Sequence, residues 1–213
     1  PNDLTATNGV SAQNWGGNRA RPDLIRKFFP QNDAPELPSY DMYVAAKDDR
    51  ALFDGVGRTL NNEDVSTFKS GYAIAKFTNF KTDGSAGHDA TFADTDYFLL
   101  RVAEADARLN GGNTTSEGTQ AVNSIRSRAH ASTRTNAYSL DDICDEWSRE
   151  FYFEGRRRMD LIRFNRYGGN NNYTWQWKGG SYEGRSFDAH LNIFAIPTNE
   201  LTANSNLTQN PGY

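Results

Sequence analysis

Residues 141–163, with the sequence DDICDEWSREFYFEGRRRMDLIR, decide the fold of this 213-residue chain. Ile143, Trp147 and Phe151 follow one another at four-residue intervals, so they share one face of a helix. Because this face is aromatic and apolar, we expect it to be buried. Gly155 comes next, where a glycine commonly ends or kinks a helix. The stretch therefore predicts two helices separated by this glycine.

Further signals mark the two ends of this helical pair. Ser139 with Asp142 three residues later resembles a capping box ahead of the first apolar residue. In the second helix, we expect Met159, Ile162 and Arg166 to continue one face.

A stripe of acidic residues runs along the same stretch at four-residue spacing: Asp142, Glu146, Glu150 and Glu154. Like charges at this spacing repel each other and need cations nearby. Several arginines are close in the sequence: Arg149, Arg156, Arg157, Arg158 and Arg163. One interpretation is a pair of catalytic carboxylates, as in a glycoside hydrolase. The other is a lattice of acids and arginines that locks helices together. We favour the lattice, because nearby arginines keep carboxylates ionised rather than raising one pKa.

Residues 95–131 predict a helical hairpin whose turn is the Asn-Gly-Gly sequence at 110–112. The inner positions of its first helix are expected to be Leu99, Val102, Ala103, Asp106 and Leu109. A capping box of Thr114 and Glu117 is expected to start the second helix, which would bury Val122, Ile125 and Ala129. Helix starts near 95, 116 and 140 are evenly spaced, which is typical of stacked, tetratricopeptide-like hairpins.

Composition excludes several classes of function. Charged residues make up 23% and hydrophobic residues 37% of the chain, and the net charge is −4 with acids and bases intermixed. This balance argues against a nucleic-acid partner, which requires a basic face. No apolar run approaches the roughly 18–20 residues of a membrane span. We predict no metal site and no cofactor, since a polar loop at 81–93 with a single histidine lacks the spacing of known sites.

Two aromatic stretches are candidate binding sites. Tyr173, Trp175 and Trp177 alternate with polar residues, so on an extended strand they would share a face about 13 Å long. Gly179-Gly180 would then turn the chain into a hairpin with Tyr182 opposite. Such a stripe could lie under two or three sugar rings, or it could cover the helices as part of a core. Both interpretations stay open.

The second candidate lies near the start of the chain, where Trp15 is flanked by glycines, Asn14 and Arg19. Aromatic faces stack on pyranose rings, while amide and guanidinium groups hydrogen-bond to sugar hydroxyls. The alternative is a tryptophan that anchors its loop to the core. Elsewhere the sequence predicts a short helix at 21–29, a short strand at 70–80, and a last short helix that Thr198 caps and that ends at Ala203. The apolar face of the first of these is expected to consist of Leu24, Ile25, Phe28 and Phe29.

These stretches also carry a resemblance to a known family. The sequence DEWSREFYFEGRRRMDLIRFNRYG at 145–168 resembles the most recognisable segment of the SusD/RagB family. The resemblance extends through DTDYFLLRVAEADARLNGG at 94–112, EGTQAVNSIRSRAHA at 117–131 and LNIFAIPTNELTANSNLTQNPGY at 191–213. It covers at least residues 90–213, and a weaker similarity reaches back to about residue 45.

The resemblance implies a function and a setting. Members of this family are non-catalytic, glycan-binding lipoproteins on the outer membrane surface of Bacteroidetes, where they serve polysaccharide utilization with a SusC-like TonB-dependent transporter. We therefore expect binding of a polysaccharide or oligosaccharide and no enzyme activity, with contact to the membrane only through a lipid anchor absent from this chain. An alternative is a scaffold that docks the transporter and has no sugar site of its own.

The resemblance also implies the architecture. We expect a mainly α, SusD-like fold of tetratricopeptide-like helical hairpins with long irregular loops and a few short strands. Full-length members are about twice as long, so the chain resembles their C-terminal part. Residues 1–94 are expected to form a loop-rich segment with a short helix and strand. Residues 95–213 are expected to form the C-terminal helical region, with the aromatic hairpin at 167–187.

Overall fold

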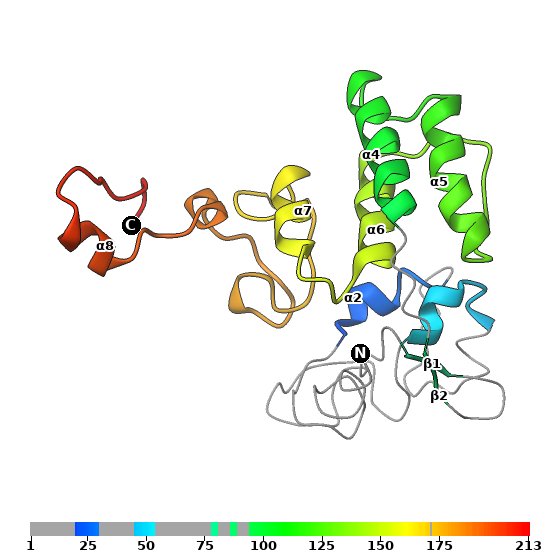
Figure 1. Cartoon of the computed structure of the whole chain (residues 1–213), viewed down its shortest axis with the longest axis horizontal. Coiled ribbons are helices and arrows are strands. Elements are labelled where there is room, and N and C mark those ends of the chain that lie inside the picture. Colours follow the sequence, from blue (N-terminus) through cyan, green and yellow to red (C-terminus); the bar gives the residue numbers. More distant parts are fainter. Residues whose placement is uncertain (1–19, 30–44, 54–77, 81–85, 89–93, 171) are drawn as a thin grey trace. The chain divides into compact units, whose positions relative to one another are not determined.

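The computed structural model describes residues 20–29, 45–53, 78–80, 86–88, 94–170 and 172–213 (Figure 1). The chain divides into two compact units, Pro1–Arg157 (unit 1) and Arg158–Tyr213 (unit 2). The fold is mainly α, which confirms the predicted class. The predicted boundary between residues 94 and 95 falls at the first residue of a helix and stays a prediction.

Three helices dominate unit 1: α4 (Asp94–Leu109), α5 (Ser116–Arg128) and α6 (Leu140–Phe151). They start within one residue of the predicted positions. Helix α4 packs against both α5 and α6, and Figure 1 shows α4 and α5 as a hairpin. The predicted helical hairpin is therefore confirmed.

The turn between α4 and α5 is held by a carboxylate. Gly111 and Gly112 both adopt positive φ, which ends α4. Asp106 on α4 accepts hydrogen bonds from the backbone N–H of Thr115, at 2.6 Å, and from its hydroxyl. Thr115 is the N-cap of α5 and accepts from the backbone of Glu117. The predicted capping residue, Thr114, was therefore wrong by one position.

Thr114 has another role, and this explains the error. Its hydroxyl is buried, lies 2.7 Å from that of Thr119, and accepts from the backbone N–H of Tyr138. The side chain thus ties the turn to the segment that enters α6. In contrast, the capping box of Ser139 and Asp142 at the start of α6 is confirmed, with hydrogen bonds in both directions.

The buried face of α5 agrees with the prediction, since Val122, Ile125 and Ala129 are all enclosed. Of the predicted inner positions of α4, Ala103 is buried, Leu99 and Asp106 are half-buried, and the other two are wrong. Leu100, Ala103 and Ala107 are buried, whereas Val102 and Leu109 are 43% and 85% exposed. Helix α4 has apolar residues on both sides, so periodicity alone could not identify the inner one.

Polar residues also lie on the buried side of α4, so this side does not show a purely apolar periodicity in the sequence. Asp96 and Glu104 are both buried there. Glu104 accepts a hydrogen bond from the indole N–H of Trp147 on α6, at 3.0 Å. Trp147 and Ile143 are enclosed and Phe151 is half-buried, as the spacing of these residues predicts.

Gly155 separates α6 from α7 (Arg157–Arg163), as predicted, and adopts a φ of +73°. The predicted inner face of α7 is wrong. Met159 is 62% exposed, while Asp160, Leu161 and Phe164 are buried. The buried positions lie one or two residues later than predicted, and the buried Asp160 pairs with Arg163 at 2.8 Å.

Two shorter elements complete the described core of unit 1: α2 (Pro22–Ile25) and the 3₁₀ helix η2 (Asp49–Phe53). The predicted apolar face of the 21–29 helix is confirmed by the burial of Ile25, Phe28 and Phe29. These residues pack with Tyr152, whose hydroxyl donates to the carbonyl of Arg50 at 3.0 Å.

A small antiparallel ladder joins β1 (Thr78–Phe80) and β2 (Ala86–His88). Strand β1 coincides with the end of the strand predicted at 70–80, and residues 70–77 lie outside the described part. Strand β2 corrects the prediction of a loop throughout 81–93. A glycine-containing run of three residues gives too short a pattern to predict.

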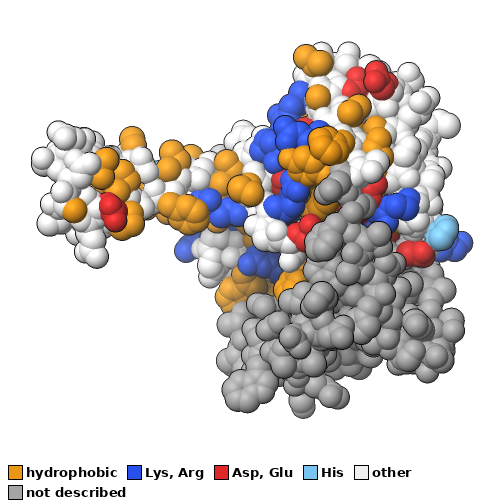
Figure 2. All heavy atoms as spheres, viewed as in Figure 1, with side chains coloured by type: hydrophobic (Ala, Val, Ile, Leu, Met, Phe, Trp, Pro, Cys, Tyr) orange, Lys and Arg blue, Asp and Glu red, His pale blue; other side chains and the backbone are white. Residues whose placement is uncertain are grey.

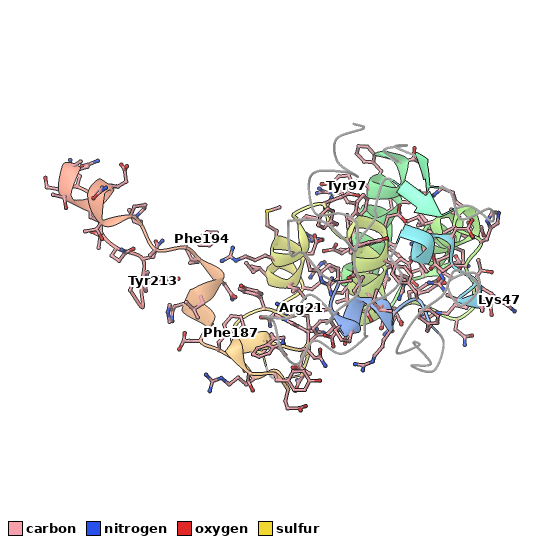
Figure 3. The ribbon with its side chains drawn as sticks, turned by 90° about the horizontal axis from the view of Figure 1, so that it is seen from below. Arg21, Lys47, Tyr97, Phe187, Phe194 and Tyr213 are labelled. Atoms are coloured by element: carbon pink, nitrogen blue, oxygen red, sulfur yellow. The ribbon has the colours of Figure 1, made fainter. Side chains whose placement is uncertain are left out.

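Unit 2 begins within α7 and continues through η3 (Lys178–Gly180), η4 (Ala189–Asn192) and α8 (Thr198–Ala203). Helix α8 ends at Ala203 as predicted, but Pro197 and not Thr198 is its N-cap. The hydroxyl of Tyr213 donates to the carbonyl of Ile193 at 2.7 Å, and Figure 3 shows Tyr213 close to Phe194. In the described residues, no helix is long and apolar enough to cross a membrane.

Candidate functional site

The acidic stripe of α6 is an ion-pair lattice. Glu146 is fully buried, and its carboxylate lies within 2.8 Å of three guanidinium groups, those of Arg50, Arg126 and Arg149. Burial alone would raise the pKa of Glu146, but the three guanidinium groups outweigh it and hold the pKa well below its usual range. Such a carboxylate cannot act as a general acid near neutral pH.

Glu150, one turn later, is paired with Arg50 at 3.0 Å and with Arg128 at 2.7 Å. Asp96 on α4 lies 2.7 Å from the same Arg128. Burial, together with the charge of Glu150, raises the pKa of Asp96 to about 6. Arginines hold the stripe at Glu146 and Glu150, and at Asp142 through Arg134, so the interpretation as a structural lattice is confirmed. The predicted cations are corrected: of the five arginines expected to pair with the stripe, Arg149 does so at Glu146, whereas Arg50, Arg126 and Arg128 pair with it from earlier segments of the chain.

Arg156 has aromatic partners. Its guanidinium lies 4.5 Å from the ring of Trp147, 4.7 Å from that of Phe151 and 4.8 Å from that of Tyr97. Tyr97, labelled in Figure 3, also accepts a hydrogen bond from Arg101 at 2.6 Å. Arg156 thus joins one ring of α4 to two rings of α6, and Trp147 among them is too deeply buried to reach a sugar.

Of the predicted glycan contacts, Asn14, Trp15 and Arg19 lie outside the described residues and stay predictions. Tyr173, Trp175 and Trp177 are all described, and all three are half-buried. They do not form the predicted strand. Trp177 adopts the left-handed conformation, with a φ of +67°, and leads directly into η3. A strand cannot pass through such a residue.

The predicted reversal of the chain at Gly179-Gly180 is present. The backbone N–H of Trp177 donates to the carbonyl of Tyr182 at 3.2 Å, and the two rings meet edge to face. Gly184 then packs so closely that a Cβ there would lie 2.3 Å from the carbonyl oxygen of Trp175. The loop is therefore a compact double turn and not an open hairpin.

The rings form a cluster that the alternation pattern did not predict. Trp175 stacks on Tyr167, with 6.1 Å between centroids and 17° between planes. Tyr173 lies 6.4 Å from Trp175. Phe187 meets Tyr167 edge to face at 4.9 Å. Trp177 and Tyr182 form a separate pair of rings on the same loop. We call these four connected rings and this pair together the ring cluster: Tyr167, Tyr173, Trp175, Trp177, Tyr182 and Phe187. Tyr167 and Phe187 have no periodic signal that could have identified them.

Lys178 explains why the loop folds around itself. Its side chain is buried, with 1% exposure, and its ammonium donates to the backbone carbonyls of Arg166, Asn170 and Tyr173 at 3.3, 2.8 and 2.5 Å. The ammonium also lies 4.7 Å from the centre of the Trp175 ring. Burial lowers the pKa of Lys178, while the carbonyl acceptors oppose that shift because they favour the charged form.

The surroundings of the ring cluster are polar and accessible. The exposed side chains next to it are an amide, a hydroxyl, a carboxylate and a guanidinium: Asn172, Thr174, Glu183 and Arg185. Half-buried rings beside such groups can stack on the apolar face of a sugar and hydrogen-bond to its hydroxyls. Within the described ranges, no three potential ligands lie close enough to hold a metal ion.

A second surface lies on α4. Phe98, Val102, Ala105 and Leu109 follow one another at spacings of four, three and four, so they form one stripe. The first, second and last of them are 64%, 43% and 85% exposed. Figure 2 shows hydrophobic side chains among those of Lys and Arg on the part of the surface that α4 forms. We call these four residues the α4 stripe. Exposed apolar stripes of this kind commonly mark protein contacts.

Known proteins provide a direct comparison. The starch-binding protein SusD of Bacteroides thetaiotaomicron is 35% identical to this chain, in an alignment that covers 99% of the chain and 43% of that protein. A SusD-like protein from Bacteroides fragilis matches with a TM-score of 0.58 at 18% identity, over 94% of this chain and 48% of that one. Surface glycan-binding protein A from Bacteroides uniformis matches with a TM-score of 0.52 at 20% identity, over 92% and 53%.

The chain thus spans about half the length of the relatives that it matches. At 18% and 20% identity, the two solved structures support the fold alone. The family model adds the decisive comparison, since the model of the SusD family matches residues 42–213, which is most of the sequence. The predicted family is therefore confirmed: the chain belongs to the SusD family.

Proposed function

We propose that this chain binds a polysaccharide or oligosaccharide without chemical change, through the ring cluster of unit 2. The observation that carries the proposal is the cluster itself, in which half-buried rings are bordered by exposed polar side chains. A relative that is 35% identical is named a starch-binding protein, which supports a glycan as the ligand. A binding protein without catalysis also agrees with Glu146 of α6, whose pKa the surrounding arginines hold well below its usual range.

The backbone of the loop adds support. Trp177 is bulky and adopts positive φ, a conformation that costs about 1–3 kcal/mol and persists only where the surrounding structure enforces it. Here the Tyr182 contact and the Lys178 hydrogen bonds enforce it. Strain of this kind is common at ligand sites, where it holds a side chain ready for binding.

The proposed setting is the outer surface of a Bacteroidetes cell, where a lipid-anchored protein passes its glycan to a SusC-like TonB-dependent transporter. The α4 stripe supports a protein partner, because exposed apolar residues at heptad spacing suit a helix or an apolar surface. Replacing Phe98 and Leu109 by serine should abolish capture of the chain by the solubilised transporter. Ile193→Ser, which removes a 55% exposed apolar side chain of unit 2, is the matched control.

The alternative is a scaffold that docks the transporter and has no sugar site in this chain. The same α4 stripe favours it. The two functions separate in one comparison: the serine variants of the stripe should retain glycan binding if the ring cluster binds sugar. Capture of the transporter by a chain that no glycan retains would establish the scaffold.

Affinity electrophoresis tests the glycan proposal. The chain is run through gels that contain soluble starch, xylan, a β-glucan or no polysaccharide. We expect at least one glycan to retard the wild type, with the retardation lost in Trp177→Ala. Phe194→Ala removes a 71% exposed ring of unit 2 outside the cluster, so it should be retarded like the wild type. Retardation that is unchanged in Trp177→Ala but lost in Trp15→Ala would move the site to the other predicted stretch.

A further inference from the structure

Lys178 is a buried cation that main-chain oxygens surround. Its ammonium donates to three carbonyls, which belong to residues 12, 8 and 5 positions earlier in the chain. Those carbonyls belong to Arg166, Asn170 and Tyr173. The hydrogen bonds therefore hold the segment 166–178, which follows α7, around the ammonium. We call the three oxygens the carbonyl cage.

The cage selects the charged form of the lysine. A neutral amine has two N–H donors, whereas the ammonium has three. Only the ammonium can therefore satisfy all three acceptors at once. The face of the Trp175 ring, 4.7 Å away, adds a cation–π contact that also requires charge.

The same residue connects the two halves of the ring cluster. The backbone N–H of Lys178 donates to the carbonyl of Trp175 at 3.1 Å, and its own carbonyl accepts from Arg185 at 2.9 Å. Its side chain donates to the backbone at Tyr173 and contacts the Trp175 ring, on which Tyr167 stacks. Lys178 thus contacts several of the segments that carry these rings.

We infer that Lys178 is the positioning residue of the ring cluster, with its ammonium in the role that a bound metal cation plays in other loops. The positioning itself is independent of any ligand. Its consequence for glycan binding rests on the function proposed above.

Limited proteolysis with chymotrypsin tests the positioning directly, because the loop holds Tyr173, Trp175 and Trp177 as cleavage sites. We expect the wild type to be protected and Lys178→Ala to be cut at least about tenfold faster in this loop, as expected for loss of local protection. Lys27→Ala is the matched control, because Lys27 is paired with the carboxylate of Asp145 at 2.7 Å in unit 1. It should leave the rate unchanged.

Chemical rescue tests whether the effect of Lys178→Ala comes from the lost ammonium or only from the lost packing of the side chain. Propylammonium replaces the atoms that Lys178→Ala removes and should restore protection. Tetramethylammonium carries the same charge without N–H donors and should not restore it. Equal protection of Lys178→Ala and the wild type would overturn the inference, and so would equal rescue by both cations.

Glycan retention of the same proteins distinguishes this inference from the proposed function. Loss of retention in Lys178→Ala, with recovery in propylammonium, supports both. Fast cleavage and specific rescue in a chain that no glycan retains support the positioning role and reject the proposed function. Full retention by a rapidly cleaved Lys178→Ala rejects the role of Lys178 in binding.

Discussion

One buried charge in unit 1 and one in unit 2 are neutralised in different ways. In unit 1, Glu146 is surrounded by arginines from three separate segments, of which one, Arg50, is distant in sequence. In unit 2, Lys178 is surrounded by backbone carbonyls from its own neighbourhood. The first arrangement joins helices into a core, whereas the second shapes a single loop.

The two arrangements differ in which side chains they leave available to a ligand. In unit 1, ion pairs engage the carboxylates of α6 and cation–π contacts engage its rings. Few of these groups are therefore available to a ligand. The cage in unit 2 leaves the surrounding polar side chains exposed, and the rings are only half-covered. The candidate sugar surface of unit 2 therefore surrounds a buried ammonium, that of Lys178, which main-chain oxygens neutralise.

The largest expected effect is on the lattice. Glu146→Gln removes the carboxylate that Arg50, Arg126 and Arg149 share, and breaking a buried pair in this way costs about 3–5 kcal/mol. The free energy of unfolding, from urea denaturation followed by circular dichroism, should fall by this amount. Glu154→Gln, an exposed member of the same acidic stripe, should change it by less than about 0.5 kcal/mol. Equal effects at both positions would contradict a buried lattice.

The difference in unfolding free energy between the wild type and Glu146→Gln should depend on pH, because the pKa of Glu146 is lowered in the folded chain. Because its pKa is lower in the folded chain than in the unfolded one, the stabilisation is complete above the ordinary carboxyl pKa and is lost as the pH falls below it. The difference between wild type and Glu146→Gln should therefore shrink in acid.

The next effect concerns the double turn of unit 2. Gly184→Ala places a Cβ 2.3 Å from the carbonyl oxygen of Trp175 at a φ of +79°. Overpacking and strain together should destabilise the loop by about 2–4 kcal/mol. Gly180→Ala is the control, since φ is +75° but no atom lies within 4 Å of the added Cβ. It should cost about 1–2 kcal/mol. Loop cleavage by chymotrypsin measures both, and equal cleavage would show that the close approach is unimportant.

A smaller effect of opposite sign is expected at Asp96. Its pKa is raised to about 6 from an ordinary value of 3.8, so its ionised form destabilises the folded chain as the pH rises through about 6. Asp96→Asn should stabilise the chain by about 1–2 kcal/mol at pH near 7.5, after discounting for the lost pair with Arg128. Near pH 4.5 the gain should be small, because Asp96 is already protonated. Thermal melts at both values measure this, and a loss of stability that is larger at the higher pH would contradict it.

The smallest effect is at the hairpin turn. Thr115→Ala removes the N-cap of α5 and should cost about 1 kcal/mol. Thr133→Ala, at an exposed position between α5 and α6, should have almost no effect. Urea denaturation of unit 1 compares the two, and an equal stability of both variants would show that the cap is dispensable.

The sequence predicted best those features that depend on local spacing. The three helices of unit 1, the capping box at Ser139 and the inner face of α5 follow from periodicity and capping chemistry. The inner face of α4 did not, because Phe98, Val102 and Leu109 form an apolar stripe on its outer side. A helix with two apolar faces has no unique periodic solution.

The site was harder to predict for a physical reason. Alternation at Tyr173, Trp175 and Trp177 is a strand pattern, yet the buried ammonium of Lys178 and the left-handed Trp177 impose turns. A lysine is usually exposed, so nothing in the sequence marks this one as the centre of a loop. The aromatic composition of the site could be predicted, but its geometry could not.

The most direct test of the central claim is an isothermal titration of the chain with an oligosaccharide of the glycan that retards it. The account predicts saturable binding that Trp177→Ala weakens by about five- to thirtyfold, which corresponds to the loss of about 1–2 kcal/mol of ring contact. Phe194→Ala should bind like the wild type. An unchanged affinity in Trp177→Ala would contradict a sugar site at the ring cluster.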